Sequence, residues 1–288
     1  MEQKIDIVLP YVDNTDRVWQ KNFYDFCIKH QLQNKIADLH TARYEDIGLI
    51  NYQLRLIEKY MPWVNTIYLL LSNKEQAPQN LPSKVKVILH EEFIPFRFLP
   101  TFNSTTIEMF LWNLPKLSEY FIYMNDDMLP FKPLTEDMFF TEDGHIKIEW
   151  WKEDFRECKS MFRYQCLNSY NHVCTRLGIK HDGIHYIRPA HSFTPMRKSH
   201  CIEVFNLLKE YMFKHIRAFR TEYQYNQYIY PIYEHLRYKS FPANIDFLYT
   251  QLEDKIDLDH DIVCLNIVPR NKEKELIKEL EKRLWVAK

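Results

Sequence analysis

Glycine is scarce in this sequence. Only four of the 288 residues are glycine, whereas average usage of about 7% would give roughly twenty. Because Gly48, Gly144, Gly178 and Gly183 are so widely spaced, no G-x-G-x-x-G dinucleotide-binding loop can be written. Gly178 and Gly183 have P-loop spacing, but isoleucine and histidine follow where lysine and serine or threonine are required. Any bound phosphate must therefore be held by metal and side chains.

Long apolar runs and excess charge are also missing. No stretch approaches the ~20 apolar residues of a membrane span, and the N-terminal sequence MEQKID lacks the basic and apolar regions of a signal peptide. Lys+Arg number 38 against 39 Asp+Glu, so the formal net charge of −1 gives no general attraction to nucleic acid. We expect a cytoplasmic protein without a nucleic-acid partner, and association with the inner face of the membrane stays open.

The six cysteines show no familiar metal-binding spacing. No C-x-x-C pair occurs, and the intervals of eight between Cys158, Cys166 and Cys174 match no common zinc motif. We interpret the cysteines as free thiols in a reducing compartment.

Apolar runs and helical patterns alternate along the first 125 residues. Strands are predicted at 4–9, 64–71, 85–90 and 120–124, and helices at 16–31, 50–60 and 104–112, with Ser104 as the cap of the last. This alternation predicts an α/β fold with a mostly parallel sheet covered by helices on both faces.

The remaining chain is less regular. Residues 135–190 are interpreted as an irregular helical insertion or lid, and residues 198–220 as a helix. A last strand is predicted at 261–266, and an amphipathic C-terminal helix within 270–288, with apolar residues at 276, 277, 280 and 284. We expect one catalytic domain spanning 1–288.

Two acidic loops follow predicted strands. Asp13 and Asp16 come after the first strand, and Asn125, Asp126 and Asp127 come after the fourth. In parallel sheets ligands bind beyond the carboxyl ends of the strands, and adjacent carboxylates favour a hard cation such as Mg²⁺ or Mn²⁺. Helix capping by Asp16, or a solvated turn before Pro130, would explain the same residues without a metal.

Other residue types suit phosphate-transfer chemistry. His191, in a segment bracketed by prolines, could act as a general base, although most of the twelve histidines must be structural or exposed. Arg43, Arg188 and Arg197 could bind phosphate through paired N–H groups. The six tyrosines between 223 and 238 could form a platform for sugar rings or could simply pack in the core.

Several segments together resemble the Stealth family of bacterial capsular and exopolysaccharide phosphotransferases, which is related to the catalytic part of GlcNAc-1-phosphotransferase. Residues 5–16 (IDIVLPYVDNTD) are similar to its first conserved region. The second region is similar at 43–46 (RYED), 54–64 (LRLIEKYMPWV), 99–104 (LPTFNS), 107–108 (IE) and 117–128 (LSEYFIYMNDDM). The third and fourth are similar at 190–195 (AHSFTP) and 263–266 (VCLN).

The resemblance implies a GT-A-like fold of the nucleotide-diphospho-sugar transferase type. It also implies transfer of a sugar-1-phosphate from a nucleotide sugar donor to a hydroxyl of a glycan or lipid-linked glycan, with release of a nucleoside monophosphate. In this scheme Asp126 and Asp127 hold Mg²⁺ or Mn²⁺ and His191 is the base. The residues implied near the donor are Asp13, Arg43, Asn103, Glu108, Asn125, Arg188 and Asn266.

One position departs from the family pattern. The last motif usually reads Asn-Asp, but Asn266 is followed here by Ile267, so a carboxylate is missing. Two alternatives stay open: an ordinary metal-dependent glycosyltransferase that releases a nucleoside diphosphate, and an inactive glycan-binding relative.

Overall fold

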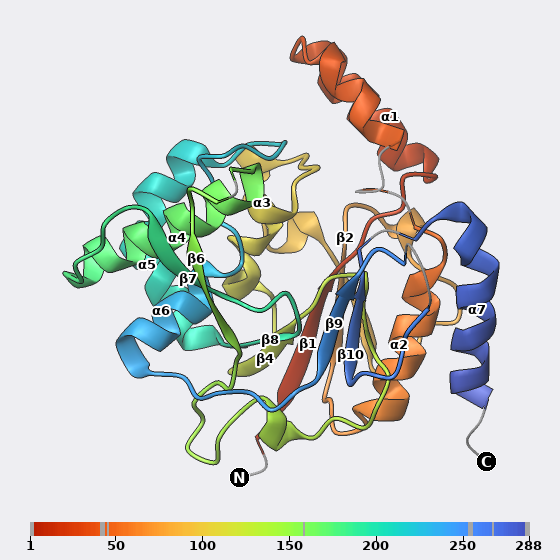
Figure 1. Ribbon diagram of the computed structural model, residues 1–288. Coiled ribbons are helices and arrows are strands. Elements are labelled where there is room, and N and C mark those ends of the chain that lie inside the picture. The colour runs from red at the N-terminus through yellow and green to blue at the C-terminus, as the bar shows by residue number, and fades with distance from the viewer. Residues whose placement is uncertain are drawn as a thin grey trace.

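The central sheet is mostly parallel. The computed structural model describes residues 3–40, 44, 46–157, 159–252, 256–266 and 268–285. Five strands lie in the order β3-β2-β1-β4-β8 (Figure 1); their bounds are β1 Ile5–Pro10, β2 Ile67–Leu71, β3 Val85–Leu89, β4 Tyr120–Tyr123 and β8 Thr194–Arg197. The first four are parallel and β8 runs antiparallel to β4. The predicted α/β class and mostly parallel sheet are confirmed.

Helices cover both faces of this sheet. Ile7 and Leu9 of β1 share a buried cluster with α2 (Leu49–Tyr60), whereas Val8 belongs to a second cluster with α5 (Lys198–His215). Because successive side chains of a strand point to opposite faces, β1 is apolar on both sides. Its carboxyl end is therefore held firmly between two packed layers.

A smaller sheet extends this frame. It contains β5 (Met128–Pro130), β10 (Ile262–Leu265) and β9 (Phe247–Thr250) in that order. The C-terminal helix α7 (Arg270–Trp285) packs against α2 and this sheet, with Leu276 and Leu280 fully buried. The amphipathic helix predicted within 270–288 is present as α7, but β5 and β9 were not predicted.

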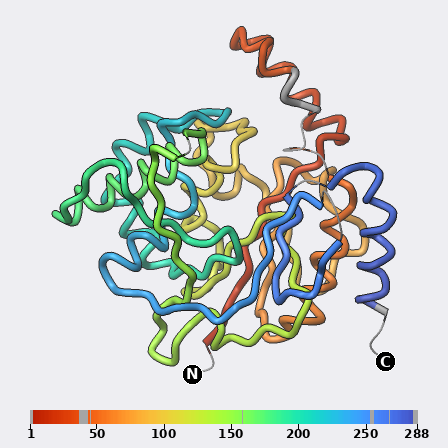
Figure 2. The backbone as a smooth tube through the Cα atoms, viewed as in Figure 1, coloured from red at the N-terminus to blue at the C-terminus, as the bar shows by residue number. Residues whose placement is uncertain are grey.

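The segment from 135 to 190 is more regular than expected. It contains the helix α4 (Met161–Leu177), in keeping with the expected helical character, and the antiparallel pair β6 (Trp150–Asp154) and β7 (His185–Pro189), which was not predicted. Ser160 caps α4, with its hydroxyl accepting from Arg163 N at 3.3 Å. Figure 2 shows the green trace of α4 and of the β6–β7 pair on one side of the red trace of β1, and the orange α2 and blue α7 on the other.

Three predictions about helix ends need correction. The helix α3 (Ser104–Glu108) is capped by Asn103, not Ser104, because the Asn103 side chain accepts from Thr105 N at 3.1 Å. It ends at Glu108 instead of reaching 112, and α5 ends at His215 instead of 220. The helix α1 (Arg17–Lys29) has Asp16 as its cap, as predicted. Short 3-10 helices occupy Gln33–His40, Lys74–Gln76, His90–Glu92, Phe96–Phe98, Leu111–Asn113 and Glu136–Met138.

The tyrosine-rich segment belongs largely to the core. The tyrosines at 225, 228, 230 and 233 are buried in and around α6 (Ile229–Tyr238), so core packing accounts for most of them. The described cysteines are buried and none forms a disulfide; Cys158 lies outside the described residues. Within the described ranges, no helix combines the length and apolar character needed to cross a bilayer.

Candidate active site

A cavity of about 790 Å³ opens at the carboxyl ends of the central strands. Its floor includes Tyr11 and Val12, which follow β1, and Asn125, Asp126 and Asp127, which follow β4. The opposite wall comes from β6, β7, α4 and β9. This is the position in which parallel α/β sheets bind ligands.

Asp46 adds a third carboxylate to the acidic side of the cavity. Its Oδ2 accepts from the Tyr11 hydroxyl at 2.7 Å, and its Oδ1 accepts from Gly48 N and Leu49 N at 2.9 and 3.1 Å. Gly48 has φ of +85°, a conformation that favours glycine, and this turn brings the start of α2 under the carboxylate. Burial raises the pKa of Asp46 above its ordinary value.

Asp126 lies among these negative charges. Burial, followed by the charges of Asp127 and Asp46, raises the pKa of Asp126 to about 8. The loop itself is fixed by Gln53, whose amide donates to the carbonyl oxygens of Asn125 and Met128 at 2.8 and 2.6 Å. Carboxylates held this close repel each other unless a proton or a cation compensates them.

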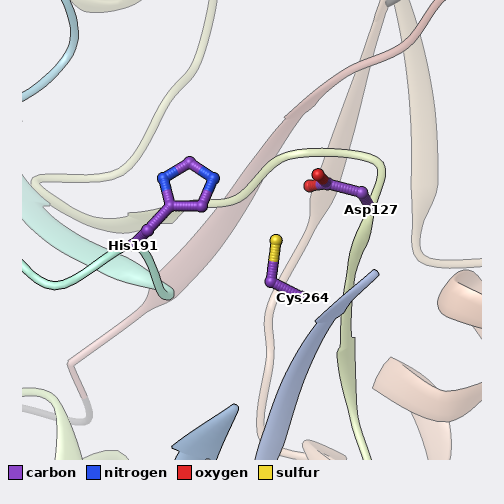
Figure 3. Close-up of side chains that lie close together, drawn as sticks. All are labelled: Asp127, His191 and Cys264. Carbon is purple, nitrogen blue, oxygen red and sulfur yellow. The ribbon is translucent and has the colours of Figure 1, made fainter. Parts of the chain in front are cut away.

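Asp127, His191 and Cys264 converge from three separate segments. Their ligand-type atoms lie within 4.8 Å of one another, and Figure 3 shows one ring nitrogen of His191 on the side of Asp127. Asp127 Oδ1 is buried without a hydrogen-bond partner. Burial and the Asp127 charge raise the pKa of Cys264 well above its ordinary value, so the thiol stays protonated.

His191 is oriented by Tyr228. The Nδ1 atom of His191 lies 2.8 Å from the Tyr228 hydroxyl, and burial raises the pKa of Tyr228, which keeps that hydroxyl protonated. Burial lowers the pKa of His191, against the opposing effect of Asp127. When Nδ1–H donates to the Tyr228 oxygen, Nε2 is left neutral and able to accept a proton, as a general base requires.

Arginines stand on the opposite wall. Arg188, 6% exposed, donates from Nε to Glu153 Oε1 at 2.8 Å, and its guanidinium lies 4.4 Å from the Trp151 ring centroid. Arg163 bonds to the other oxygen of Glu153 and also lines the cavity. Two guanidinium groups thus share one carboxylate, which leaves positive charge available to an anionic ligand.

Sequence comparisons give the chain its family. The family model for Stealth protein CR2, conserved region 2, matches residues 43–148 of the chain. The capsular polysaccharide phosphotransferase LcbA of Neisseria meningitidis is 31% identical over 253 residues, which is 84% of this chain and 67% of that protein. The chain belongs to the Stealth family.

Other curated proteins are similar to this chain over shorter spans. A capsular polysaccharide phosphotransferase of Neisseria meningitidis serogroup B is 31% identical over 212 residues, covering 72% of this chain and 57% of the relative. The exopolysaccharide phosphotransferase cps2G of Lactiplantibacillus plantarum is 40% identical over 143 residues, covering 49% and 40%. The chain therefore spans between 40% and 67% of the length of these three curated relatives.

Among solved structures, the chain is similar to the galactosyltransferase LgtC. One LgtC structure, in complex with donor and acceptor sugar analogues, has a TM-score of 0.46 and 13% identity over 98% of this chain and 97% of that chain.

Asn103 and Glu108, which the Stealth motifs imply near the donor, already form hydrogen bonds to other residues of the protein. Besides capping α3, Asn103 donates to Arg217 O and Gln224 Oε1 at 3.0 and 3.1 Å. Glu108 accepts from Gln227 N at 2.8 Å and from the Tyr123 hydroxyl at 3.1 Å. Both line the cavity and are almost fully buried. They hold the cavity wall together and offer few polar atoms to a ligand.

The other predicted residues take different places. Asp13 accepts from the backbone and hydroxyl of Thr15 at 2.8 and 2.9 Å, and is absent from the described residues that line the cavity. Arg197 pairs with Glu119 at 3.4 Å, also away from the described lining. Asn266 lines the cavity at the end of β10, whereas Arg43 lies outside the described residues.

Several lining residues escaped the sequence prediction. They are Asp46, Trp151, Phe162, Arg163, Arg220 and Tyr249. Cys264, which lies beside Asp127 and His191, was not predicted either. Asp46 and Cys264 stand inside the motifs quoted for the Stealth resemblance, so the signal for them was present. The aromatic residues belong to segments without a motif, and nothing in their local sequence points to a cavity.

Proposed function

We propose that this Stealth protein transfers a sugar-1-phosphate from a nucleotide diphosphate sugar to a hydroxyl of a glycan or lipid-linked glycan. The observation that carries the proposal is the position of His191, with Nδ1 held by Tyr228 and its other nitrogen on the side of Asp127. A neutral base beside a carboxylate, facing a cavity with an arginine wall, suits an attack by a hydroxyl on a phosphate. The names of the curated relatives support the same reaction class.

The residues of the cavity fit a divalent cation. Asp127 Oδ1 is buried and unpaired, and the carboxylates of Asp46 and Asp126 raise each other's energy in the absence of positive charge. Mg²⁺ and Mn²⁺ are bound by one or two carboxylates together with phosphate oxygens. We assign this role to Asp126 and Asp127. Such an ion would neutralise part of the negative charge on the diphosphate of the donor.

The reaction balances with groups present in the chain. His191 Nε2 accepts the proton of the acceptor hydroxyl. At the same time the oxygen of that hydroxyl forms a bond to the phosphorus that carries the sugar. The bond from that phosphorus to the bridging oxygen of the diphosphate breaks. A nucleoside monophosphate leaves, and a sugar phosphodiester remains. The positive charges of Arg163 and Arg188 attract and position the donor phosphates. Positioning and charge stabilisation supply most of the catalysis in phosphoryl transfer.

The whole chain acts as one catalytic unit in this proposal. The lining residues run from Pro10 to Val268, so no part of the sequence completes the cavity alone. The segment 135–190 contributes Trp151, Phe162 and Arg163 to one wall, in keeping with a lid or insertion over the cavity.

The released nucleotide tests the proposal. With a panel of nucleotide sugars, Mg²⁺ and a glycan acceptor, we expect a nucleoside monophosphate and a phosphodiester signal in phosphorus NMR. Substitution His191→Ala should lower kcat by about 10²–10⁴-fold while donor binding persists. Release of a nucleoside diphosphate would instead identify an ordinary glycosyltransferase. Absence of both turnover and metal-dependent donor binding in the unmodified protein would indicate an inactive relative.

A further inference from the structure

Three large aromatic side chains are exposed inside the cavity. Trp151 and Phe162 are each 37% exposed and Tyr249 is 44% exposed, and all three line the cavity. They come from β6, the first turn of α4 and β9. Exposed aromatic surface in a concave site is the feature by which pockets bind apolar faces of ligands.

Two of these rings contact the proposed base. The Phe162 and His191 ring centroids are 6.4 Å apart at an interplanar angle of 84°. The Tyr249 and His191 centroids are 5.5 Å apart at 72°. A general base must lie within hydrogen-bond reach of the hydroxyl that it deprotonates. A group that packs on Phe162 and Tyr249 therefore lies beside the hydroxyl that His191 deprotonates.

The third ring is held in place at the edge of this group. Trp151 stacks on Phe247, with centroids 5.9 Å apart at 30°, and the Arg188 guanidinium lies over it at 4.4 Å. Arg188 also lies 5.7 Å from the Phe162 ring centroid. A cation between two rings restricts their movement, so the surface is formed before a ligand arrives.

We propose that Phe162 and Tyr249, with Trp151 at their edge, form the acceptor subsite, which binds a pyranose ring of the glycan through its C–H face. This inference rests on the function proposed above, because that function makes a glycan the acceptor. The apolar C–H face of a sugar carries slight positive charge and packs against the electron-rich face of an aromatic ring. The polar edge of the same sugar remains free to present a hydroxyl to His191.

The test compares acceptor and donor kinetics in single variants. We choose Phe162→Ala and Tyr249→Ala, because both side chains are partly exposed and their removal leaves the core intact. We expect KM for the acceptor to rise by about tenfold, while acceptor-independent release of the nucleotide and the KM for the donor stay unchanged. Tyr249→Phe, which keeps the ring, should bind the acceptor nearly as well as the unmodified protein.

The matched control is Phe96→Ala. Phe96 is 89% exposed and is absent from the described cavity lining, so its loss should change neither KM. An unchanged acceptor KM in both test variants would overturn the subsite. A rise in donor KM alone would also overturn it, because the rings would then belong to the donor.

A second measurement separates this proposal from the catalytic one. Saturation-transfer NMR with methyl pyranosides of the common hexoses and N-acetylhexosamines reports ring contact without turnover. If the unmodified protein releases no nucleotide from any donor, the proposed function fails. Transfer to sugar C–H protons that disappears in Phe162→Ala and persists in Phe96→Ala would still support the subsite. No transfer to any pyranoside would overturn it.

Discussion

At the scale of single residues, burial decides the protonation state of the proposed base and of its tyrosine partner. Burial lowers the pKa of His191 and raises that of its partner Tyr228, so the imidazole is neutral and the phenol remains a phenol near neutral pH. His191 and Tyr228 thus keep their hydrogen bond of 2.8 Å over the pH range in which histidine can act as a base. The orientation of the ring follows from packing, since Tyr228 is itself fully enclosed.

His90 gives a prediction about pH and stability. Burial lowers the pKa of His90 to about 4 from an ordinary value of 6.5, and its Nε2 has no hydrogen-bond partner. Between these values the unfolded chain binds more protons at this residue than the folded protein does, so stability falls as the pH decreases through this window. The contribution lost by pH 5 is about 2 kcal/mol.

Urea denaturation of the unmodified protein and of His90→Gln measures this contribution. The loss of unfolding free energy between pH 7.5 and pH 5 should be smaller by about 2 kcal/mol in the variant, whatever its stability at pH 7.5. Equal losses in the two proteins would show that His90 titrates normally in the folded state.

At the scale of elements, the C-terminal helix α7 stabilises the frame without reaching the cavity. Leu276 and Leu280 are fully buried in a cluster that includes Leu56 of α2. Leu280→Ala should therefore reduce the free energy of unfolding by about 2–5 kcal/mol. Equilibrium urea denaturation measures this loss, and kcat of the remaining folded protein should be unchanged.

The exposed Lys278 on the same helix supplies the control. Lys278→Ala should change stability by no more than about 0.5 kcal/mol. If Leu280→Ala were as mild as this control, α7 would contribute little to the fold despite its burial.

Element identity was predictable where local patterns are strong. The strands β1, β2, β3 and β4 follow directly from apolar runs. The helix α7 follows from the 3.6-residue spacing of its apolar residues. The short strands β5 and β9 were missed because three or four residues carry no measurable period. The cap at Asn103 was assigned one residue too late, since asparagine and serine are both good caps and only the hydrogen bond to Thr105 N distinguishes them.

At the scale of the whole molecule, binding of donor and metal should increase the stability of the folded protein. A ligand that binds only the folded protein stabilises it by about 2.7 kcal/mol at a hundred times its Kd. We expect a nucleotide sugar with Mg²⁺ to raise Tm in thermal-shift assays, and Asp127→Asn to remove most of this rise because Asp127 is assigned to the cation.

Asp137→Asn is the matched control, because Asp137 is exposed and absent from the described cavity lining. It should retain the full increase in Tm. An increase in Asp127→Asn as large as in the unmodified protein, or one that persists in EDTA, would contradict a metal role for this carboxylate.

The sequence by itself determined the layers of the fold and the two acidic loops at the strand ends, because strand and helix periods and chain polarity are local properties. It also carried the motifs of the Stealth family. Only the tertiary structure decided that Asp127 meets His191 and Cys264, that Asp46 joins the carboxylates, and that Asn103 and Glu108 support the cavity wall. These contacts join segments distant in sequence, and they depend on how the second sheet, α4 and α6 pack around the first, which no local period encodes.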